Sequence, residues 1–306
     1  GSSMLVADLA MKFRAEGRRF ILKCINVENN PSHFTELSKN TERFGAALVT
    51  NLYGSFSDHI PTILETIGSC PALFFMDPYG LAPIKFNNLR PIFRRTASTE
   101  ILINFSRKGL QRLAGNLDAE PETEKGKKAA ETKVRTLTEV LDTDRWKEIW
   151  RHIDDPSLRD RMILDLYREK LYEHFVHIYP IEIKTEFKSS PKYYLVYATS
   201  KYDGVEFIND FVYDIQKSLF LQAHPIFRDL PIEKELTKLK AEIYDYGRKK
   251  GKLTLSEIRE HFIPDRFSRL KVKHYNQLVR ELWKEGGKIR KFGDKAIRDG
   301  DVLKFV

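Results

Sequence analysis

The segment best suited to do chemistry is an apolar run that ends at an acid, a proline and an aromatic residue. Ala72 to Met76 is apolar, and Asp77-Pro78-Tyr79-Gly80 follows it directly. Such a run is typical of a strand covered on both faces, and ligand sites in open α/β sheets lie beyond the carboxyl ends of these strands. The pattern therefore predicts a cleft lined by Asp77, Pro78 and Tyr79. The alternative is an ordinary turn, because Asp, Pro and Gly are standard turn residues.

The elements that would position this loop alternate between strands and helices. Strands are expected at Phe20–Glu28, Ala46–Phe56 and Thr99–Phe105, with helices between them. Alternation of this kind predicts an α/β fold with a doubly wound sheet. Asn104, at the end of its strand, is a further candidate to face the cleft, or else a polar strand end in water.

The middle of the chain departs from this alternation. Residues 117–133 are rich in acids, lysines and alanines, which predicts an exposed, mobile connection. Residues 134–178 have helical spacing of apolar side chains and form an expected helical insert. A strand pair around residues 181–198 and a helix from Gly204 to Leu219 complete a first domain of residues 1–231.

The composition excludes several classes of protein. The chain has 306 residues, of which 42% are hydrophobic, enough for two domains with cores. It has no apolar run long enough for a membrane span and no signal-peptide pattern, so a cytoplasmic protein without membrane association is expected. Cys24 and Cys70 are interpreted as small core residues, and no metal site is predicted.

The positive charge is concentrated in the C-terminal residues. Of the formal net charge of +9, residues 232–306 carry +8, from 20 Lys and Arg against 12 Asp and Glu. Their pattern predicts three helices followed by a hairpin, with Thr254 and Glu257 capping the second helix. This order is typical of a winged helix, so residues 232–306 form the expected second domain.

A winged helix of this charge predicts an interface with DNA or RNA. The third helix would act as the recognition helix, and the hairpin would form the wing. Winged helices also serve as protein-docking modules, which is the alternative. The expected nucleic-acid-binding residues are Lys273, His274, Gln277, Arg280, Arg290, Lys291, Lys295 and Arg298.

The chain resembles the three-Cys-motif partner proteins, a family of Rossmann-like (class I) methyltransferases. The resemblance spans residues 1–220 and rests on Phe74–Gly80, Glu100–Phe105 and Tyr193–Ser200 with the helix after Gly204. The Asp77–Gly80 loop is also similar to that of tRNA guanine dimethyltransferases. The resemblance implies S-adenosyl-L-methionine as cofactor and a companion protein that bears three cysteines. It also implies that Asp77, Pro78 and Tyr79 are catalytic residues that position an exocyclic amine.

The same resemblance implies a cofactor site. Glu28, at its strand end, matches the acid that holds the cofactor ribose. The loop with Gly54, Ser55 and Phe56 occupies the place where the adenine is bound, although Ser55 replaces the usual acid there.

The family's first strand and its glycine-rich loop have no counterpart in the sequence. That strand lies centrally in such a sheet, and its absence would leave two strand edges unpaired. Either the chain lacks its true N-terminus, or another segment supplies the strand.

Two functions follow from these patterns. One is an S-adenosyl-L-methionine-dependent methyltransferase acting on an exocyclic amine of a nucleobase in DNA or RNA. The other is a non-catalytic methyltransferase-like module that binds nucleic acid or protein; Ser55 and the missing loop favour it. Whether the chain is an enzyme stays open at this point.

Overall fold

The chain folds into a mixture of helices and strands, which confirms the predicted α/β class. The computed structural model describes residues 2–187, 189–286, 288–291 and 296–306. Contacts divide it into two compact units, Gly1–His174 and Phe175–Val306.

The first unit opens with alternating elements, as predicted. They are α1 (Ser2–Ala15), β1 (Cys24–Glu28), α2 (Pro31–Thr41), β2 (Val49–Tyr53), α3 (Phe56–Ile67), β3 (Ala72–Met76), α4 (Phe86–Phe93), β4 (Thr99–Phe105) and α5 (Arg107–Ala114). Two short 3₁₀ helices, Glu42–Phe44 and Ala82–Ile84, lie between them.

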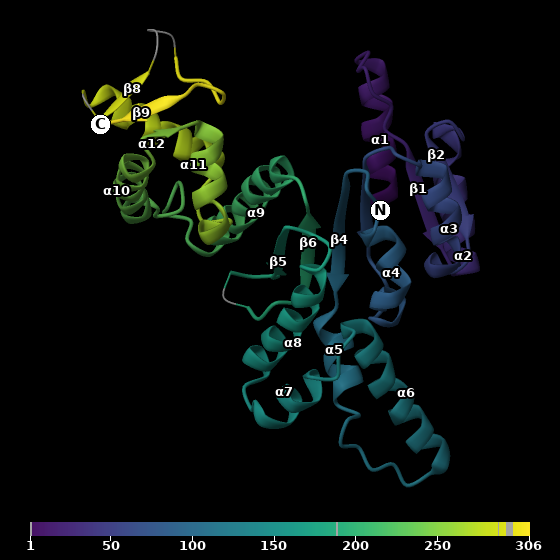
Figure 1. The fold of residues 1–306 in the computed structure, drawn as a ribbon. Coiled ribbons are helices and arrows are strands. Elements are labelled where there is room, and N and C mark those ends of the chain that lie inside the picture. The colour runs from purple at the N-terminus through teal and green to yellow at the C-terminus, as the bar shows by residue number, and fades with distance from the viewer. Residues whose placement is uncertain (1, 188, 287, 292–295) are drawn as a thin grey trace. The chain divides into compact units, whose positions relative to one another are not determined.

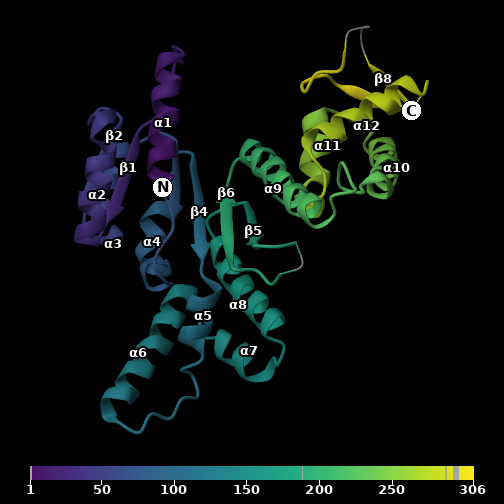
Figure 2. The same cartoon turned by 180° about the vertical axis from the view of Figure 1, so that it is seen from behind.

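The strands of this unit form two separate parallel pairs. β1 pairs with β2, with Cys24 opposite Val49 and Glu28 opposite Tyr53. β3 pairs with β4, with Ala72 opposite Thr99. Figures 1 and 2 both show β1 and β2 side by side near α2 and α3. Within the described ranges no strand joins β1 to β3. The doubly wound order itself stays a prediction.

β3 is covered on one face only, which corrects the expectation of a strand buried on both faces. Phe74 and Met76 are buried, but Leu73 and Phe75 on the opposite face are 60% and 46% exposed. Side chains alternate between the two faces of a strand, so all side chains of an apolar run are buried only if both faces are covered. The apolar run specified the strand but not its second layer.

Three helices follow β4 and α5 in the first unit. These are α6 (Glu124–Leu141), α7 (Trp146–His152) and α8 (Pro156–Leu171). α6 corrects the predicted mobile connection, because residues 124–133 are helical. Thr123 caps this helix by accepting the N–H of Gly126 at 3.1 Å, and Ala130 is buried. Alanine, lysine and glutamate are strong helix formers, so this composition suits a helix as well as a linker.

The second unit contains a strand pair, a long helix and the C-terminal elements for which a winged helix is predicted. The elements are β5 (His177–Ile183), β6 (Tyr193–Thr199), α9 (Tyr202–Ala223), α10 (Glu233–Lys250), β7 (Lys252–Leu253), α11 (Leu255–Phe262), α12 (Val272–Lys284), β8 (Ile289–Lys291) and β9 (Leu303–Phe305). β5 and β6 are antiparallel, as predicted. The predicted domain boundary at residues 231 and 232 lies inside this unit, between α9 and α10, and stays a prediction.

The C-terminal elements have the order of a winged helix. Three helices surround a small antiparallel sheet in which β9 lies between β7 and β8. Their shared core includes Leu239, Ile258, Tyr275, Leu282 and Phe305. The predicted cap of α11 is present, because Thr254 accepts the N–H of Glu257 while the Glu257 carboxylate accepts the N–H of Thr254.

Candidate nucleic-acid interface and amine-binding loop

The Asp77 loop lies where two parallel strands end side by side. β3 ends at Met76 and its neighbour β4 carries Asn104, so the pairing brings Asp77 and Asn104 together. The Asn104 side-chain N–H donates to Asp77 Oδ1 at 2.6 Å. Asn104 Oδ1 is buried and accepts no hydrogen bond from the described residues. This corner therefore offers one exposed acceptor, the Asp77 carboxylate, to a donor such as an amine, while the unsatisfied Asn104 Oδ1 is buried.

The rest of the loop presents an aromatic ring to solvent. Pro78 is half-buried, and Tyr79 is 95% exposed. Gly80 has φ +91°, a conformation that side chains rarely adopt, and a Cβ there would lie 3.1 Å from the Arg112 guanidinium. Glycine thus permits the tight return of the chain that leaves the Tyr79 ring free to stack on a planar ligand.

Glu28 fits the ribose end of the expected cofactor. It ends β1 and is half-buried, and its Oε1 accepts the N–H of Asn30 at 2.8 Å. Asn30 in turn caps α2 by accepting the N–H groups of Ser32 and His33. Among the described donors, none bonds to Glu28 Oε2, so that oxygen is open to a hydroxyl pair.

The adenine loop is less well matched. Gly54 donates its N–H to the Glu28 carbonyl at 3.0 Å, and a Cβ there would lie 3.0 Å from His59 Nε2. The Ser55 and Ser57 hydroxyls bond to one another at 2.8 Å, and Phe56 is half-buried at the start of α3. No glycine-rich loop precedes β1 in the described chain. Among the described residues, Glu28 can therefore serve the ribose end of the expected cofactor, whereas the methionine end has no such loop to approach it.

α12 exposes a basic stripe. Lys273, Gln277, Arg280 and Lys284 recur at helical spacing, and all four are exposed. Lys284 was not predicted, although its position four residues after Arg280 places it on the same face. Among the residues that the structure describes, none forms an ion pair with Lys273, Arg280 or Lys284.

His274 is a correction to the predicted interface. It is 9% exposed, and its ring packs edge-on against Tyr213 of α9 at 5.7 Å between centroids. Its Nδ1 accepts the backbone N–H of Lys271 at 3.0 Å. Burial, reinforced by Lys273, lowers the pKa of His274. The neutral ring is therefore a structural cap for α12 rather than an exposed contact.

The remaining candidates are the residues predicted on or near the wing, and they differ in exposure. Arg290 and Arg298 are exposed as expected. Lys291 is a second correction, because its ammonium lies 2.6 Å from Asp301 and its side chain is only 6% exposed. The hydrogen bond from Lys291 lowers the pKa of Asp301. Lys295 lies outside the described residues.

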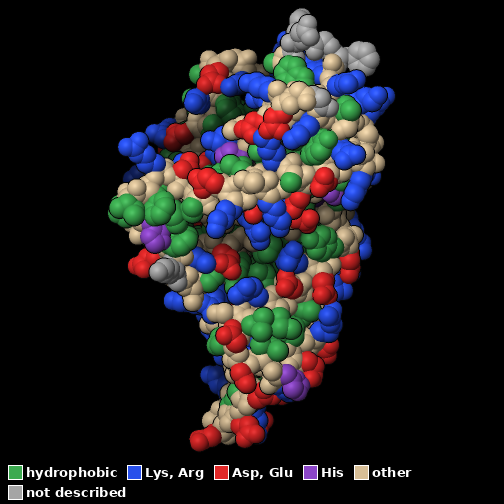
Figure 3. Space-filling view, turned by 90° about the vertical axis from the view of Figure 1, so that its left-hand side faces the viewer, with side chains coloured by type: hydrophobic (Ala, Val, Ile, Leu, Met, Phe, Trp, Pro, Cys, Tyr) green, Lys and Arg blue, Asp and Glu red, His purple; other side chains and the backbone are tan. Residues whose placement is uncertain are grey.

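Around the stripe, Lys and Arg side chains are mixed with acids. In Figure 3 the winged-helix elements face the viewer in the upper part of the view, where blue and red side chains alternate. Arg266, for example, is buried and pairs with Glu235 and Glu242. These three residues line a polar hollow of about 340 Å³ beside α10 and α11. Cations paired in this way contribute to the fold and are not free to bind phosphate.

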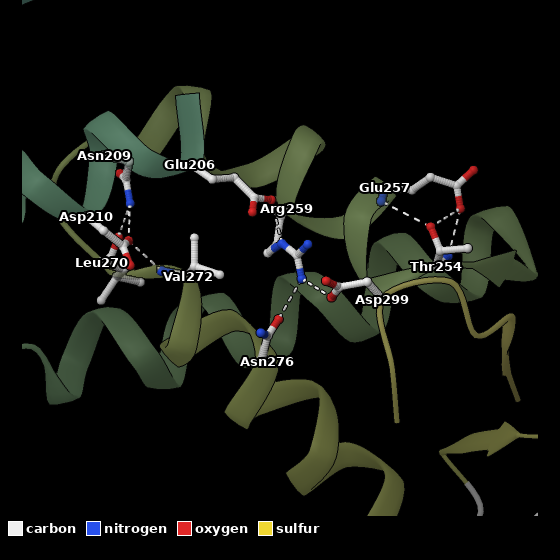
Figure 4. A network of polar contacts seen from close by, with 10 residues as sticks. All are labelled: Glu206, Asn209, Asp210, Thr254, Glu257, Arg259, Leu270, Val272, Asn276 and Asp299. Atoms are coloured by element: carbon white, nitrogen blue, oxygen red, sulfur yellow. Dashed lines mark hydrogen bonds and ion pairs between the residues drawn. The ribbon is translucent and has the colours of Figure 1, made fainter. Parts of the chain in front are cut away.

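A buried cation that sequence reasoning missed holds the module together. Arg259 of α11 is 4% exposed and donates to Glu206 at 2.6 Å, Asn276 at 2.9 Å and Asp299 at 2.7 Å (Figure 4). Burial raises the pKa of Glu206, although the bond from Arg259 opposes that rise. No local pattern marks Arg259, because its partners come from α9, α12 and the wing.

Comparisons with known proteins found no likeness. No family model, curated protein or solved structure matches this chain.

Two further findings concern excluded kinds of site. Among the described residues, no group of three His, Cys, Asp or Glu side chains could hold a metal ion. No helix in the described part is long and apolar enough to cross a membrane.

Cys24 is half-buried and bonds to Asn26, but Cys70 is exposed, which corrects its interpretation as a core residue. Cys70 lies in the short turn between α3 and β3, where no second layer covers it.

Proposed function

We propose that this protein binds nucleic acid through its winged helix. The observation that carries the proposal is the set of exposed cations on α12 and the wing that have no acidic partner among the described residues. Unpaired Lys and Arg side chains on one face attract phosphates and release counterions when they bind them. Neighbouring cations such as Lys240 and Lys271 are held by acids instead.

The test is equilibrium binding of a labelled duplex, followed by fluorescence anisotropy. The double variant Arg280→Ala with Lys284→Ala is expected to lower the affinity about tenfold, which is ~1.4 kcal/mol. Lys234→Ala is the matched control, because Lys234 is an exposed, unpaired cation at the start of α10 within the described chain. Equal affinities for the wild type and the double variant would contradict the proposal.

A second candidate is methyl transfer from S-adenosyl-L-methionine to an exocyclic amine of a nucleobase. The pairing of Asn104 with the exposed Asp77 carboxylate favours it, because this acceptor for an amine comes two residues before the exposed Tyr79 ring. Bound cofactor would supply the methyl group, and Glu28 would hold its ribose. Orientation of the amine accounts for much of the acceleration in such a transfer. The three-cysteine companion and a cytoplasmic location remain predictions.

Calorimetric titration of S-adenosyl-L-methionine into the whole chain tests this candidate. Binding is expected in the wild type and in Glu36→Ala, and its loss is expected in Glu28→Ala. Glu36 is an exposed acid on α2 and serves as the control. Absence of binding in the wild type would contradict methyl transfer and leave the winged-helix proposal untouched.

A further inference from the structure

The first turn of α12 is occupied by α9. The Lys271 ammonium lies 2.7 Å from Asp214, and the N–H of Val272 donates to Asp210 Oδ1 at 2.8 Å. Asp210 thereby satisfies one of the backbone donors left open at the helix start. The Lys271 side chain and the Val272 N–H at the helix start are thus engaged by another element of the same unit.

The connection between α11 and α12 is fixed in the same way. Asn209 is fully buried, and its side chain donates to the Leu270 carbonyl at 2.8 Å (Figure 4). The same side chain accepts the Ser268 N–H at 2.7 Å. Gln216 also donates to the Ser268 hydroxyl at 2.9 Å. A buried amide with both of its atoms satisfied holds the loop in one position.

This arrangement takes up part of the helix end that ordinarily reads sequence and leaves Lys273 as its exposed cation. In helix-turn-helix proteins, residues at the N-terminal end of the recognition helix contact base edges. Here Lys271 and His274 face α9 instead. An amide further along the helix is also engaged, because Gln277 donates to Glu281 at 3.0 Å. That bond, with one from Lys240, lowers the pKa of Glu281 and keeps it charged.

What remains exposed is suited to phosphates. Lys273 and Lys284, with Arg280 between them, lie eleven residue steps apart, which is about 17 Å of helix at about 1.5 Å per residue. Neighbouring phosphates of one strand are about 3.4 Å apart along the duplex axis, so the three side chains can reach different phosphates. Arg290 and Arg298 add exposed charge from the wing.

We infer that α12 and the wing bind the phosphodiester backbone of a duplex and do not read its base sequence. The inference rests on the proposed nucleic-acid binding and specifies its target. Phosphate contacts fix the position of a protein on a duplex but carry no sequence information. DNA and RNA present the same backbone charge, so the bound duplex can be of either kind.

The experiment measures binding of the whole chain to several unrelated DNA and RNA duplexes of about 20 base pairs. Affinities for different sequences of one duplex type are expected to agree within about threefold. The slope of log affinity against log salt is expected near −4.5 if all five cations bind phosphates, at about −0.9 for each. A preference above about thirtyfold for one sequence would overturn the inference but not the proposed function. Failure to bind any duplex would contradict the proposed function itself.

Variants separate backbone binding from base reading. Arg280→Gln and Lys284→Gln are each expected to weaken binding to every duplex equally and to reduce the salt slope by about 1. Lys234→Gln is the charge-matched control on α10. A loss confined to one sequence would show that the substituted residue reads a base and would overturn the inference.

Discussion

Single buried charges decide much of the local structure. Asp160 of α8 is fully buried and accepts hydrogen bonds from Arg107 at 2.6 Å and Gln111 at 2.9 Å, both on α5. The two helices are therefore joined by a desolvated ion pair as well as by apolar packing. Removing one member of such a pair leaves the other charge without compensation.

Asp160→Ala is expected to lower the free energy of unfolding by about 2–4 kcal/mol, because Arg107 loses its partner in a mostly buried place. Urea denaturation followed by circular dichroism measures this change. Asp165→Ala is the control on the same helix, since Asp165 pairs with Arg168 at the surface and should matter by less than about 1 kcal/mol. Equal effects of the two variants would contradict the role of the buried pair.

His274 makes stability depend on pH. Burial lowers its pKa in the folded protein, so the unfolded chain binds the proton more readily. Its contribution is fully present above the unfolded pKa of about 6.5 and is lost as the pH falls below that value toward the folded pKa.

His274→Asn keeps an acceptor for the Lys271 N–H but cannot titrate. The difference in unfolding free energy between about pH 7.5 and about pH 5.5 is therefore expected to be smaller in the variant. Denaturation curves at the two pH values measure it. His174 and His177 also have lowered pKa values and keep part of the dependence in both proteins. An unchanged pH dependence would show that His274 is not buried as a neutral ring.

At the scale of elements, α10 and β9 meet at a glycine. Gly247 is buried, and a Cβ built on it would overlap the Phe305 ring. Glycine within a helix costs about 1 kcal/mol relative to alanine, so its presence reflects this close approach. The Phe305 ring belongs to the apolar core that the C-terminal elements share.

Gly247→Ala is expected to lower the free energy of unfolding by about 1–3 kcal/mol in spite of the better helix propensity, because the added methyl displaces Phe305. Thermal or urea denaturation measures the effect. Lys249→Ala, at an exposed position on the same helix, should stay within about 0.5 kcal/mol of the wild type. A stabilised Gly247→Ala would mean that the ring moves aside without cost.

At the scale of the whole molecule, the proposed chemistry and the proposed binding reside in different units. Asp77 and Glu28 belong to the first compact unit, and the basic stripe belongs to the second. The charge is divided in the same way, because nearly all of the net +9 comes from residues 232–306. The proposed attraction to a polyanion therefore belongs to the second unit.

This division predicts separable losses. Asp77→Ala is expected to abolish methyl transfer while duplex affinity stays within about twofold, because no phosphate-binding cation is changed. Arg280→Ala with Lys284→Ala is expected to lower affinity about tenfold for the same substrate. Transfer of a radiolabelled methyl group and anisotropy provide the two readouts. Loss of duplex binding in both variants would refute the division.

Much of the fold could be predicted because it depends on local patterns. β3 and β4 occupy the predicted residues, and α10, α12 and the Thr254 cap agree closely with their expected positions. Apolar spacing, breakers and caps act over a few residues, so they can be read along the chain. The exposed positions Lys273, Arg280 and Lys284 follow from the same helical period.

The sequence by itself thus determined most elements and the basic C-terminal module, whereas the hydrogen bond between Asn104 and Asp77 came from the tertiary structure. Only the tertiary structure decided that His274 and Lys291 are structural and that Leu73 is exposed on an uncovered face of β3. The physical reason is the distance along the chain between residues that interact. Burial and pairing depend on residues far along the chain, such as Tyr213 for His274, and no local pattern encodes which distant side chain will arrive.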